Sequence, residues 1–161
     1  MAKIIDSAAE RLEILNHYRR FAMVGLSGNQ YRPSHFAAIY MLAEGYEVIP
    51  INPREPEILR RQSYPSLTAL AEVDPEAVKL VDIFRKPEDV PAIVEEAIAV
   101  GAEVVWMQLG VIHEAAAQRA VEAGLNVVMD RCVKIEHARF FGGLNTIGLN
   151  TGIITARRVL G

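Results

Sequence analysis

The chain has 161 residues, about half of them apolar and 23% of them charged, and its formal net charge is −3. This is the composition of a globular protein, and the length suits one domain, residues 1–161, with its own core. The slight negative charge argues against a general nucleic-acid binder, whose surface usually carries a basic excess. The single cysteine rules out an internal disulfide and fits a reducing cytoplasm. No apolar run reaches the roughly 18 residues that span a bilayer, so we expect a cytoplasmic protein with no membrane partner.

The first twenty residues predict a leading helix. Ser7 and Glu10 have the spacing of a capping box, in which the two side chains satisfy free backbone N–H groups at a helix start. Apolar residues then recur at roughly helical spacing as far as Tyr18.

The strongest local pattern is a strand, a glycine turn and a helix start between residues 21 and 35. The apolar run 21–26 predicts a buried strand, and Gly25-Leu26-Ser27-Gly28 breaks it into a polar turn. Pro33 and Ser34 then predict the first turn of a helix over 34–44. Such a turn directs backbone N–H groups and the positive end of a helix dipole at one point, so it suits the diphosphate of a nucleotide cofactor.

The rest of the chain alternates between strand and helix patterns. Further strands are predicted over 46–51, 77–84, 103–107 and 126–130, and helices over 90–100, 112–123 and 131–137. The stretch 57–73 is less regular, with one short helix capped by Ser66, and the glycine-rich tail 142–161 predicts a loop. This alternation predicts an α/β fold with a doubly wound, parallel, five-stranded sheet in three layers, α/β/α.

In a doubly wound sheet, ligands bind at the carboxyl ends of the strands, near the point where the strand order reverses. That rule brings the loops 27–34, 52–54, 84–86 and 108–111 to one edge, with Cys132 on the same edge. Each loop taken alone is more simply a solvated turn, so the predicted site depends on the predicted fold.

The residue types at this edge limit the candidate cofactors but do not identify one. A dinucleotide fingerprint has a third turn glycine and an acidic residue near the end of the second strand. Here the third glycine is missing, and Asn52-Pro53-Arg54 follows the strand in place of an acid. A neutral and basic loop suits a phosphorylated ribose, which both NADP and coenzyme A contain.

Several side chains are candidates for phosphate contact. Arg32, Arg54 and Arg85 have the forked donor geometry that suits phosphate, although each is equally consistent with a solvated surface arginine. Ser27 and Asn29 have the position to donate to phosphate or to cap the turn. His35 is either a cation beside the phosphates or a half-buried side chain without a ligand role.

The sequence resembles the stand-alone CoA-binding domain family, whose Rossmann-like fold also forms the CoA-binding half of the succinyl-CoA synthetase alpha subunit. The segments that carry the resemblance are 24–27, 32–34, 45–53, 81–85, 106–110, 130–132 and 136–137. The resemblance implies coenzyme A, or an acyl-CoA, as the ligand. It implies a diphosphate site at Gly25, Ser27, Gly28, Asn29, Arg32 and Ser34, a site for the phosphorylated ribose and adenine at Asn52, Pro53, Arg54, Phe84 and Arg85, and a pantetheine site at Gln108 and Gly110.

The resemblance implies binding without catalysis, because the phosphorylated histidine of succinyl-CoA synthetase lies in a second domain for which this chain has no room. Cys132 and His137 are five residues apart, which does not bring side chains together on a helix, and no spacing suits a metal. A mixed disulfide between Cys132 and the CoA thiol under oxidising conditions is a separate hypothesis. An NAD(P)-linked oxidoreductase and an interaction module with a vestigial cleft remain as alternatives, as do a homodimer and an enzyme partner.

Overall fold

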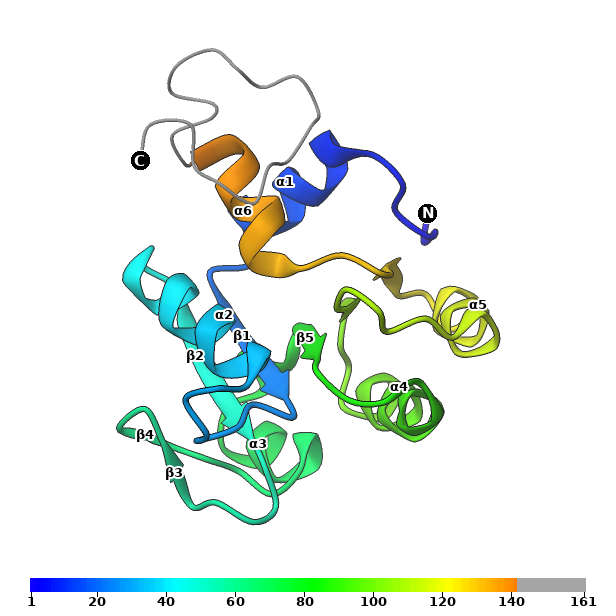
Figure 1. Cartoon of the computed structure of the whole chain (residues 1–161). Coiled ribbons are helices and arrows are strands. Elements are labelled where there is room, and N and C mark those ends of the chain that lie inside the picture. Colours follow the sequence, from blue (N-terminus) through cyan, green and yellow to red (C-terminus); the bar gives the residue numbers. More distant parts are fainter. Residues whose placement is uncertain (142–161) are drawn as a thin grey trace.

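The computed structural model describes residues 1–141. Its centre is a parallel sheet of five strands in the order β2-β1-β5-β6-β7 (Figure 1). The strands are β1 (Arg20–Val24), β2 (Glu47–Ile51), β5 (Leu80–Ile83), β6 (Val104–Met107) and β7 (Asn126–Val128). The chain runs from β1 outward to β2 and then crosses to β5 on the other side of β1, so the strand order reverses between β1 and β5.

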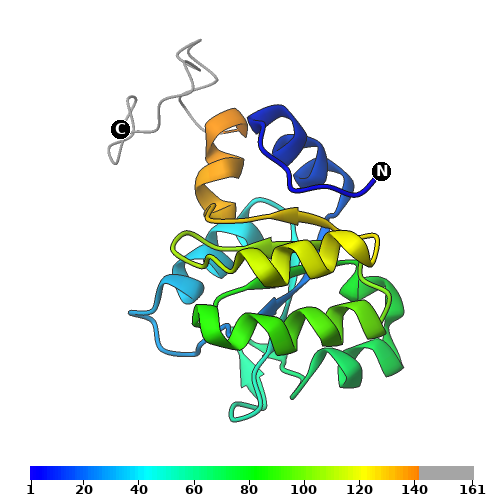
Figure 2. The same ribbon diagram turned by 90° about the vertical axis from the view of Figure 1, so that its right-hand side faces the viewer.

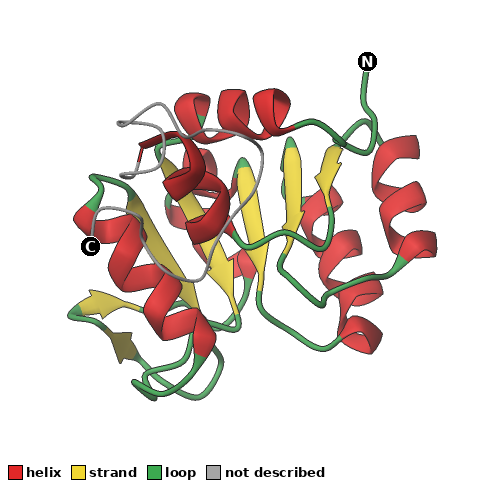
Figure 3. Cartoon of the chain, turned by 45° about the horizontal axis from the view of Figure 1, so that its top comes forward, coloured by secondary structure: helices red, strands yellow, loops and turns green. Residues whose placement is uncertain are grey.

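Helices cover both faces of the sheet, which confirms the doubly wound α/β fold in three layers (Figure 3). One face packs against α1 (Ala8–His17), α2 (Pro33–Ala43) and α6 (Val133–Phe141). The other packs against α3 (Leu67–Val73), α4 (Val90–Ala99) and α5 (Glu114–Glu122), of which α4 and α5 lie side by side in Figure 2. No helix within residues 1–141 has the length and apolarity to cross a membrane.

The strands are buried on both faces, which explains why they appear in the sequence as continuous apolar runs rather than alternating ones. In β5, Val81 and Ile83 belong to the core cluster beneath α3, α4 and α5, whereas Leu80 belongs to the cluster beneath α1, α2 and α6. Each fully buried large apolar side chain of this kind stabilises the fold by roughly 1.5–3 kcal/mol.

The local capping signals of the sequence are present. The Ser7 hydroxyl accepts a hydrogen bond from the Glu10 backbone N–H at 3.1 Å, which is one half of the predicted capping box. The Glu10 carboxylate accepts from the Ser7 hydroxyl at 2.9 Å and pairs with Lys3, so its contacts differ from those of the other half. The Ser66 hydroxyl accepts from the Ala69 backbone N–H at 3.1 Å, so it caps α3 as expected. Pro33 occupies the start of α2.

Two of the predicted boundaries were wrong for a reason that the structure shows. The strand predicted over 77–84 begins only at Leu80, because Pro75 starts a short 3-10 helix, η1 (Pro75–Val78), that continues through the apolar residues before it. The helix predicted from residue 112 begins at Glu114, because the His113 side chain accepts the Ala116 backbone N–H and caps it. His113 therefore lies just before the helix as its N-cap and is not within it.

The stretch 57–73 contains an element that the sequence pattern missed. A short antiparallel hairpin of β3 (Glu57–Ile58) and β4 (Arg61–Gln62) precedes α3, with Leu59 and Arg60 at positive φ in its turn. Neither turn residue is glycine or asparagine, so the usual hairpin signal is missing. A second 3-10 helix, η2 (Pro87–Asp89), leads into α4. The predicted tail loop, 142–161, lies outside the described residues.

Candidate functional site: a cavity at the carboxyl edge of the sheet

A cavity of about 1330 Å³ lies at the carboxyl edge of the sheet, across the point where the strand order reverses. Loops after β1, β2, β5 and β6 line it, together with the start of α6. Of the thirteen predicted site residues, ten line this cavity: Gly25, Ser27, Arg32, Ser34, Asn52, Pro53, Arg54, Phe84, Arg85 and Gln108. Gly28, Asn29 and Gly110 belong to the same loops but are not among the lining residues.

Gly25 lets the turn after β1 lie against the end of β5. Its φ is +91°, and a Cβ at this position would collide with the Phe84 carbonyl oxygen. Its N–H donates to the Ile51 carbonyl at 3.0 Å. A glycine is therefore required here both by the backbone conformation and by the close approach of two loops.

Side chains of the turn itself satisfy several of the backbone groups that the sequence suggested for phosphate. The Ser34 hydroxyl accepts the Ser27 N–H at 3.1 Å, and the Ser27 hydroxyl accepts the Asn29 N–H at 3.0 Å. The buried His35 ring lies with its Nδ1 2.9 Å from the Ser27 carbonyl oxygen. Ser27, Ser34 and His35 thus hold the shape of the turn.

The Gly28 N–H is satisfied from a different loop. It donates at 3.0 Å to the Oε2 atom of Glu55, and the Asn52 side-chain amide donates to the same oxygen at 3.2 Å. Residues 52–54, directly after β2, contain no acid, as the sequence analysis noted. Glu55 follows them, and its carboxylate contacts the turn after β1. The Asn52 side chain also accepts the Arg54 and Glu55 N–H groups, at 2.8 and 3.2 Å. Such an Asx turn is the sequence signal that would have pointed to Glu55.

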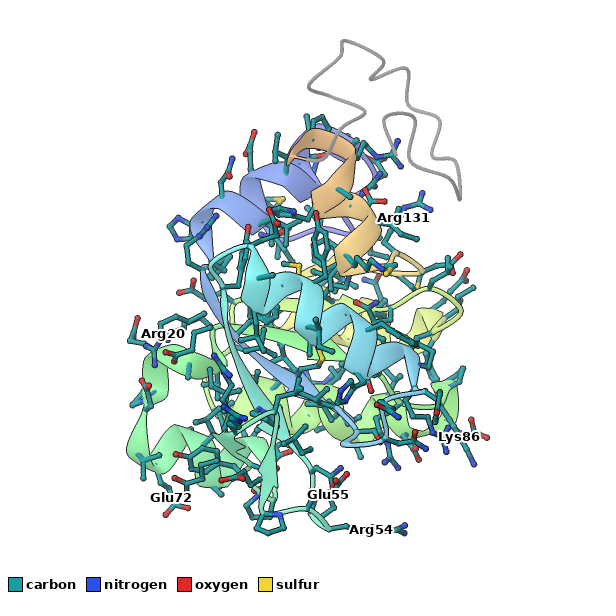
Figure 4. All side chains as sticks on the ribbon, turned by 60° about the vertical axis from the view of Figure 1, so that its left-hand side comes forward. Arg20, Arg54, Glu55, Glu72, Lys86 and Arg131 are labelled. Carbon is teal, nitrogen blue, oxygen red and sulfur yellow. The ribbon has the colours of Figure 1, made fainter. Side chains whose placement is uncertain are left out.

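The cavity is rimmed by cations that are available to an anionic ligand. Arg32, Arg54 and Lys86 line it, and none of the three forms an ion pair with another residue of the described chain. Figure 4 shows Arg54 extending outward beside Glu55, with Lys86 farther along the same side of the molecule. Arg85 also lines the cavity, but its guanidinium is paired with Asp89 at 2.9 Å. Lys86 lies in the predicted loop 84–86, but its side chain was not among the predicted phosphate contacts.

The other end of the cavity is largely apolar. Leu109, Val111, Cys132 and Ile135 line it beside Gln108, which is only 3% exposed. The Gln108 side-chain oxygen accepts the Val133 N–H at 3.2 Å, which joins the loop after β6 to the start of α6. One amide among apolar side chains suits a ligand arm that is mostly hydrocarbon with a few amide groups.

Helix α6 is attached to the rest of the fold by buried polar contacts. The Arg11 guanidinium donates to the Glu136 carboxylate at 2.5 Å, with both side chains buried. The His137 Nδ1 atom lies 2.8 Å from the Tyr40 hydroxyl, and the same ring packs edge-on against Tyr46. Burial lowers the pKa of His137. Glu136 and His137 therefore contact α1 and α2, while Cys132 lines the cavity.

Asp82 is a buried carboxyl group that no pattern singled out. It lies in the middle of β5 with zero exposure, between Met23 and Trp106 on the neighbouring strands. Neither of its side-chain oxygens has a hydrogen-bond partner in residues 1–141. Burial raises the pKa of Asp82 well above its ordinary value. It does not line the cavity.

Comparison with known proteins decides the family. The family model of the CoA binding domain matches residues 19–138. The chain belongs to this family. It is 39% identical over 132 residues to the uncharacterized protein YneT of Bacillus subtilis (strain 168), which covers 82% of this chain and 95% of that protein.

Solved structures share the fold of this family member. A hypothetical protein from Pyrococcus horikoshii OT3 is 36% identical, with a TM-score of 0.79 over 88% of this chain and 99% of that one. The structure of cell-free ID.343 from Thermus thermophilus is 31% identical, with a TM-score of 0.76 over 84% and 100% of the two chains. The resemblance that the sequence motifs indicated is thereby confirmed.

Proposed function

We propose that this chain binds coenzyme A, or an acyl-CoA, in the cavity at the carboxyl edge of the sheet, and that it holds the ligand without transforming it. Membership of the CoA binding domain family supports binding of coenzyme A in general. The observation that carries the proposal in this chain is the cavity itself. It combines three cations without ion-pair partners among the described residues with an apolar end that contains one amide, and coenzyme A combines phosphates with a long arm of amides and hydrocarbon.

The charge distribution of the cavity supports one orientation of the ligand. In this orientation the diphosphate lies over the turn that contains Gly25 and Ser27, near Arg32. The phosphorylated ribose and adenine lie by Arg54 and Phe84, where a guanidinium and an aromatic ring line the cavity together. The pantetheine arm runs toward Gln108 and the loop at Gly110, and its thiol approaches Cys132. The mixed disulfide at Cys132 stays a prediction.

The contacts of His137, the histidine closest in sequence to Cys132, support the proposal that binding is not catalytic. A thiol nucleophile is usually activated by an adjacent base. The His137 ring instead contacts Tyr40 and Tyr46 on the side of α2 and β2. A ligand-binding or sensing role uses the cavity without requiring such a pair.

The first experiment is thermal denaturation of the whole chain with coenzyme A, dephospho-CoA, NADPH, NADH and ATP, each added separately. A ligand at about a hundred times its dissociation constant stabilises the folded state by roughly 2.7 kcal/mol. In a chain of this size that moves the midpoint by several degrees. We expect the largest shift with coenzyme A.

The other outcomes of this experiment separate the alternatives. A shift with NADPH and none with coenzyme A would contradict the proposal and favour a dinucleotide-linked oxidoreductase. No shift with any ligand would favour an interaction module, provided that mass spectrometry of the denatured protein finds no co-purified cofactor.

A further inference from the structure

The Glu55 carboxylate occupies the position on the turn where a ligand phosphate would be expected. Its Oε2 atom accepts the Gly28 N–H at 3.0 Å, and a Cβ on Gly28 would collide with the same carboxylate. The N–H groups on either side of Gly28, those of Ser27 and Asn29, are satisfied within the turn by the hydroxyls of Ser34 and Ser27. Gly28 is therefore the position in this turn where an N–H donates to an anion that comes from another loop.

The loop after β2 holds Glu55 in this position through Asn52. The Asn52 side-chain oxygen accepts the Glu55 N–H at 3.2 Å, and its side-chain nitrogen donates both to the Glu55 carboxylate, at 3.2 Å, and to the Leu26 carbonyl, at 3.0 Å. If the carboxylate moves away, Asn52 keeps its bond to Leu26, so the two loops stay connected. Glu55 is only partly buried, and it lines the cavity.

A carboxylate and a phosphate bind the same kind of donor, an N–H near a helix N-terminus, and they repel each other. They cannot both accept the Gly28 N–H. We propose that Glu55 is an internal anion that occupies the Gly28 N–H in the unliganded protein and is displaced when the diphosphate of the ligand binds. This inference rests on the proposed function, because it concerns the same turn and the same ligand.

Two consequences follow from the exchange of one anion for another. The exchange weakens binding, because the hydrogen bonds of Glu55 must be broken and its negative charge stays near the diphosphate. The effect falls only on ligands that bring an anion to this point, because a ligand without the diphosphate leaves the carboxylate in place. Glu55 thus lowers the affinity for diphosphate ligands by competition rather than by contact.

The test is calorimetric titration of coenzyme A into the wild-type chain, Glu55→Ala and Glu55→Gln. We expect Glu55→Ala to bind coenzyme A roughly five to ten times more tightly, which corresponds to about 1–1.4 kcal/mol. Glu55→Gln removes the charge but keeps an oxygen that can accept the Gly28 N–H, so its gain is expected to be smaller. Pantetheine, which lacks the diphosphate, is expected to bind all three proteins with equal affinity.

Glu88→Gln is the matched control. Glu88 also lines the cavity and is exposed, and it makes no hydrogen bond to the turn. Its replacement changes the net charge by the same amount as Glu55→Gln, so it reports the general electrostatic effect, which we expect to be less than twofold. Thermal midpoints of all four proteins check that each is folded.

Suppose that the wild-type chain binds coenzyme A and that the Glu55 variants bind it equally or more weakly. That result overturns the inference and leaves the proposed function intact. Weaker binding would mean that Glu55 contacts the ligand, for example at a ribose hydroxyl. A gain in Glu88→Gln as large as that in Glu55→Gln would also overturn it, since the effect would then be one of net charge. If none of the four proteins, the wild type included, binds coenzyme A, both the inference and the proposed function fail.

Discussion

The two faces of the sheet are stabilised in different ways. On the face beneath α3, α4 and α5 the core consists of apolar side chains such as Val81, Ile83 and Val94. On the face beneath α1, α2 and α6, buried ionisable groups accompany the apolar core: Arg11, His35, Asp82, Glu136 and His137. The first face is held by the area of apolar surface removed from water, and the second also by directional bonds between particular atoms.

Because of this difference, we expect the two faces of the sheet to respond differently to pH and to substitution. Apolar burial is nearly independent of pH, whereas a buried group whose pKa shifts on folding, such as Asp82 or His137, links stability to its own protonation. Helix α6 follows the cavity residue Cys132 and is bonded to Arg11 and Tyr40. The polar face therefore positions one wall of the site.

The largest expected effect is that of Glu136→Ala. It leaves the buried Arg11 guanidinium without its carboxylate, and breaking a buried ion pair in this way costs about 3–5 kcal/mol. The comparison variant on the apolar face is Val94→Ala, with an expected cost of about 2 kcal/mol from lost burial and a small cavity. Urea denaturation measures both. A smaller loss in Glu136→Ala than in Val94→Ala would contradict the importance given to the ion pair.

Asp82 tests the comparison between the two faces through the direction in which pH changes the free energy of unfolding. Its folded-state pKa is raised by burial, so the folded state retains a proton that the unfolded state loses near pH 4. Its contribution to stability is complete below that pH and decreases as pH rises toward the folded-state pKa. We expect Asp82→Asn to gain stability relative to the wild type as pH is raised from about 4, in urea denaturation at a series of pH values. A constant difference between the two proteins across the series would sink this interpretation.

His137 has the opposite sign. Its folded-state pKa is lowered, chiefly by burial, with an opposing effect of Glu44 and a further lowering by Arg19. The contribution of His137 is complete above about pH 6.5 and is lost as pH falls toward the folded-state pKa. The wild type should lose more stability than His137→Gln between pH 7.5 and pH 5. Equal losses in the two proteins would mean that the acid sensitivity comes from elsewhere.

The smallest expected effect is at the edge where the two faces meet. If Arg54 binds the ribose phosphate, Arg54→Ala weakens the binding of coenzyme A by roughly tenfold, because one charge-assisted contact is lost. The binding of dephospho-CoA, which lacks that phosphate, should weaken by less than about twofold. Arg32→Ala, at a residue assigned to the diphosphate, should weaken the binding of both ligands by the same factor. Calorimetric titration distinguishes the two patterns, and equal losses of both ligands in Arg54→Ala would remove its assignment.

Much of the fold followed from patterns between near neighbours in the sequence. The continuous apolar runs of the five strands, the Ser7–Glu10 capping box and Pro33 at the start of α2 all act within a few residues. Where two patterns competed over a short stretch, the prediction was wrong. The apolar residues Ala77 and Val78 suit a strand, but they lie in the 3-10 helix that follows Pro75.

The loops of the site could be named from the sequence because parallel strands place their carboxyl ends at one edge. The partners within those loops were harder to predict. Glu55 lies 27 residues from Gly28, so the Asx turn at Asn52 indicates where Glu55 lies but not which N–H its carboxylate accepts. Arg85 and Asp89 are only four residues apart, a spacing that suits an ion pair on its own, although the prediction assigned Arg85 to a phosphate.

By itself, then, the sequence determined the strand–turn–helix start, the alternation of elements, the edge of the site and the family. Only the tertiary structure decided the carboxylate on Gly28, the buried pair of Arg11 and Glu136, 125 residues apart, and the isolated burial of Asp82. The physical reason is range. Periodicity and capping depend on residues within one or two turns, whereas the partner of a polar side chain depends on which distant elements pack against it.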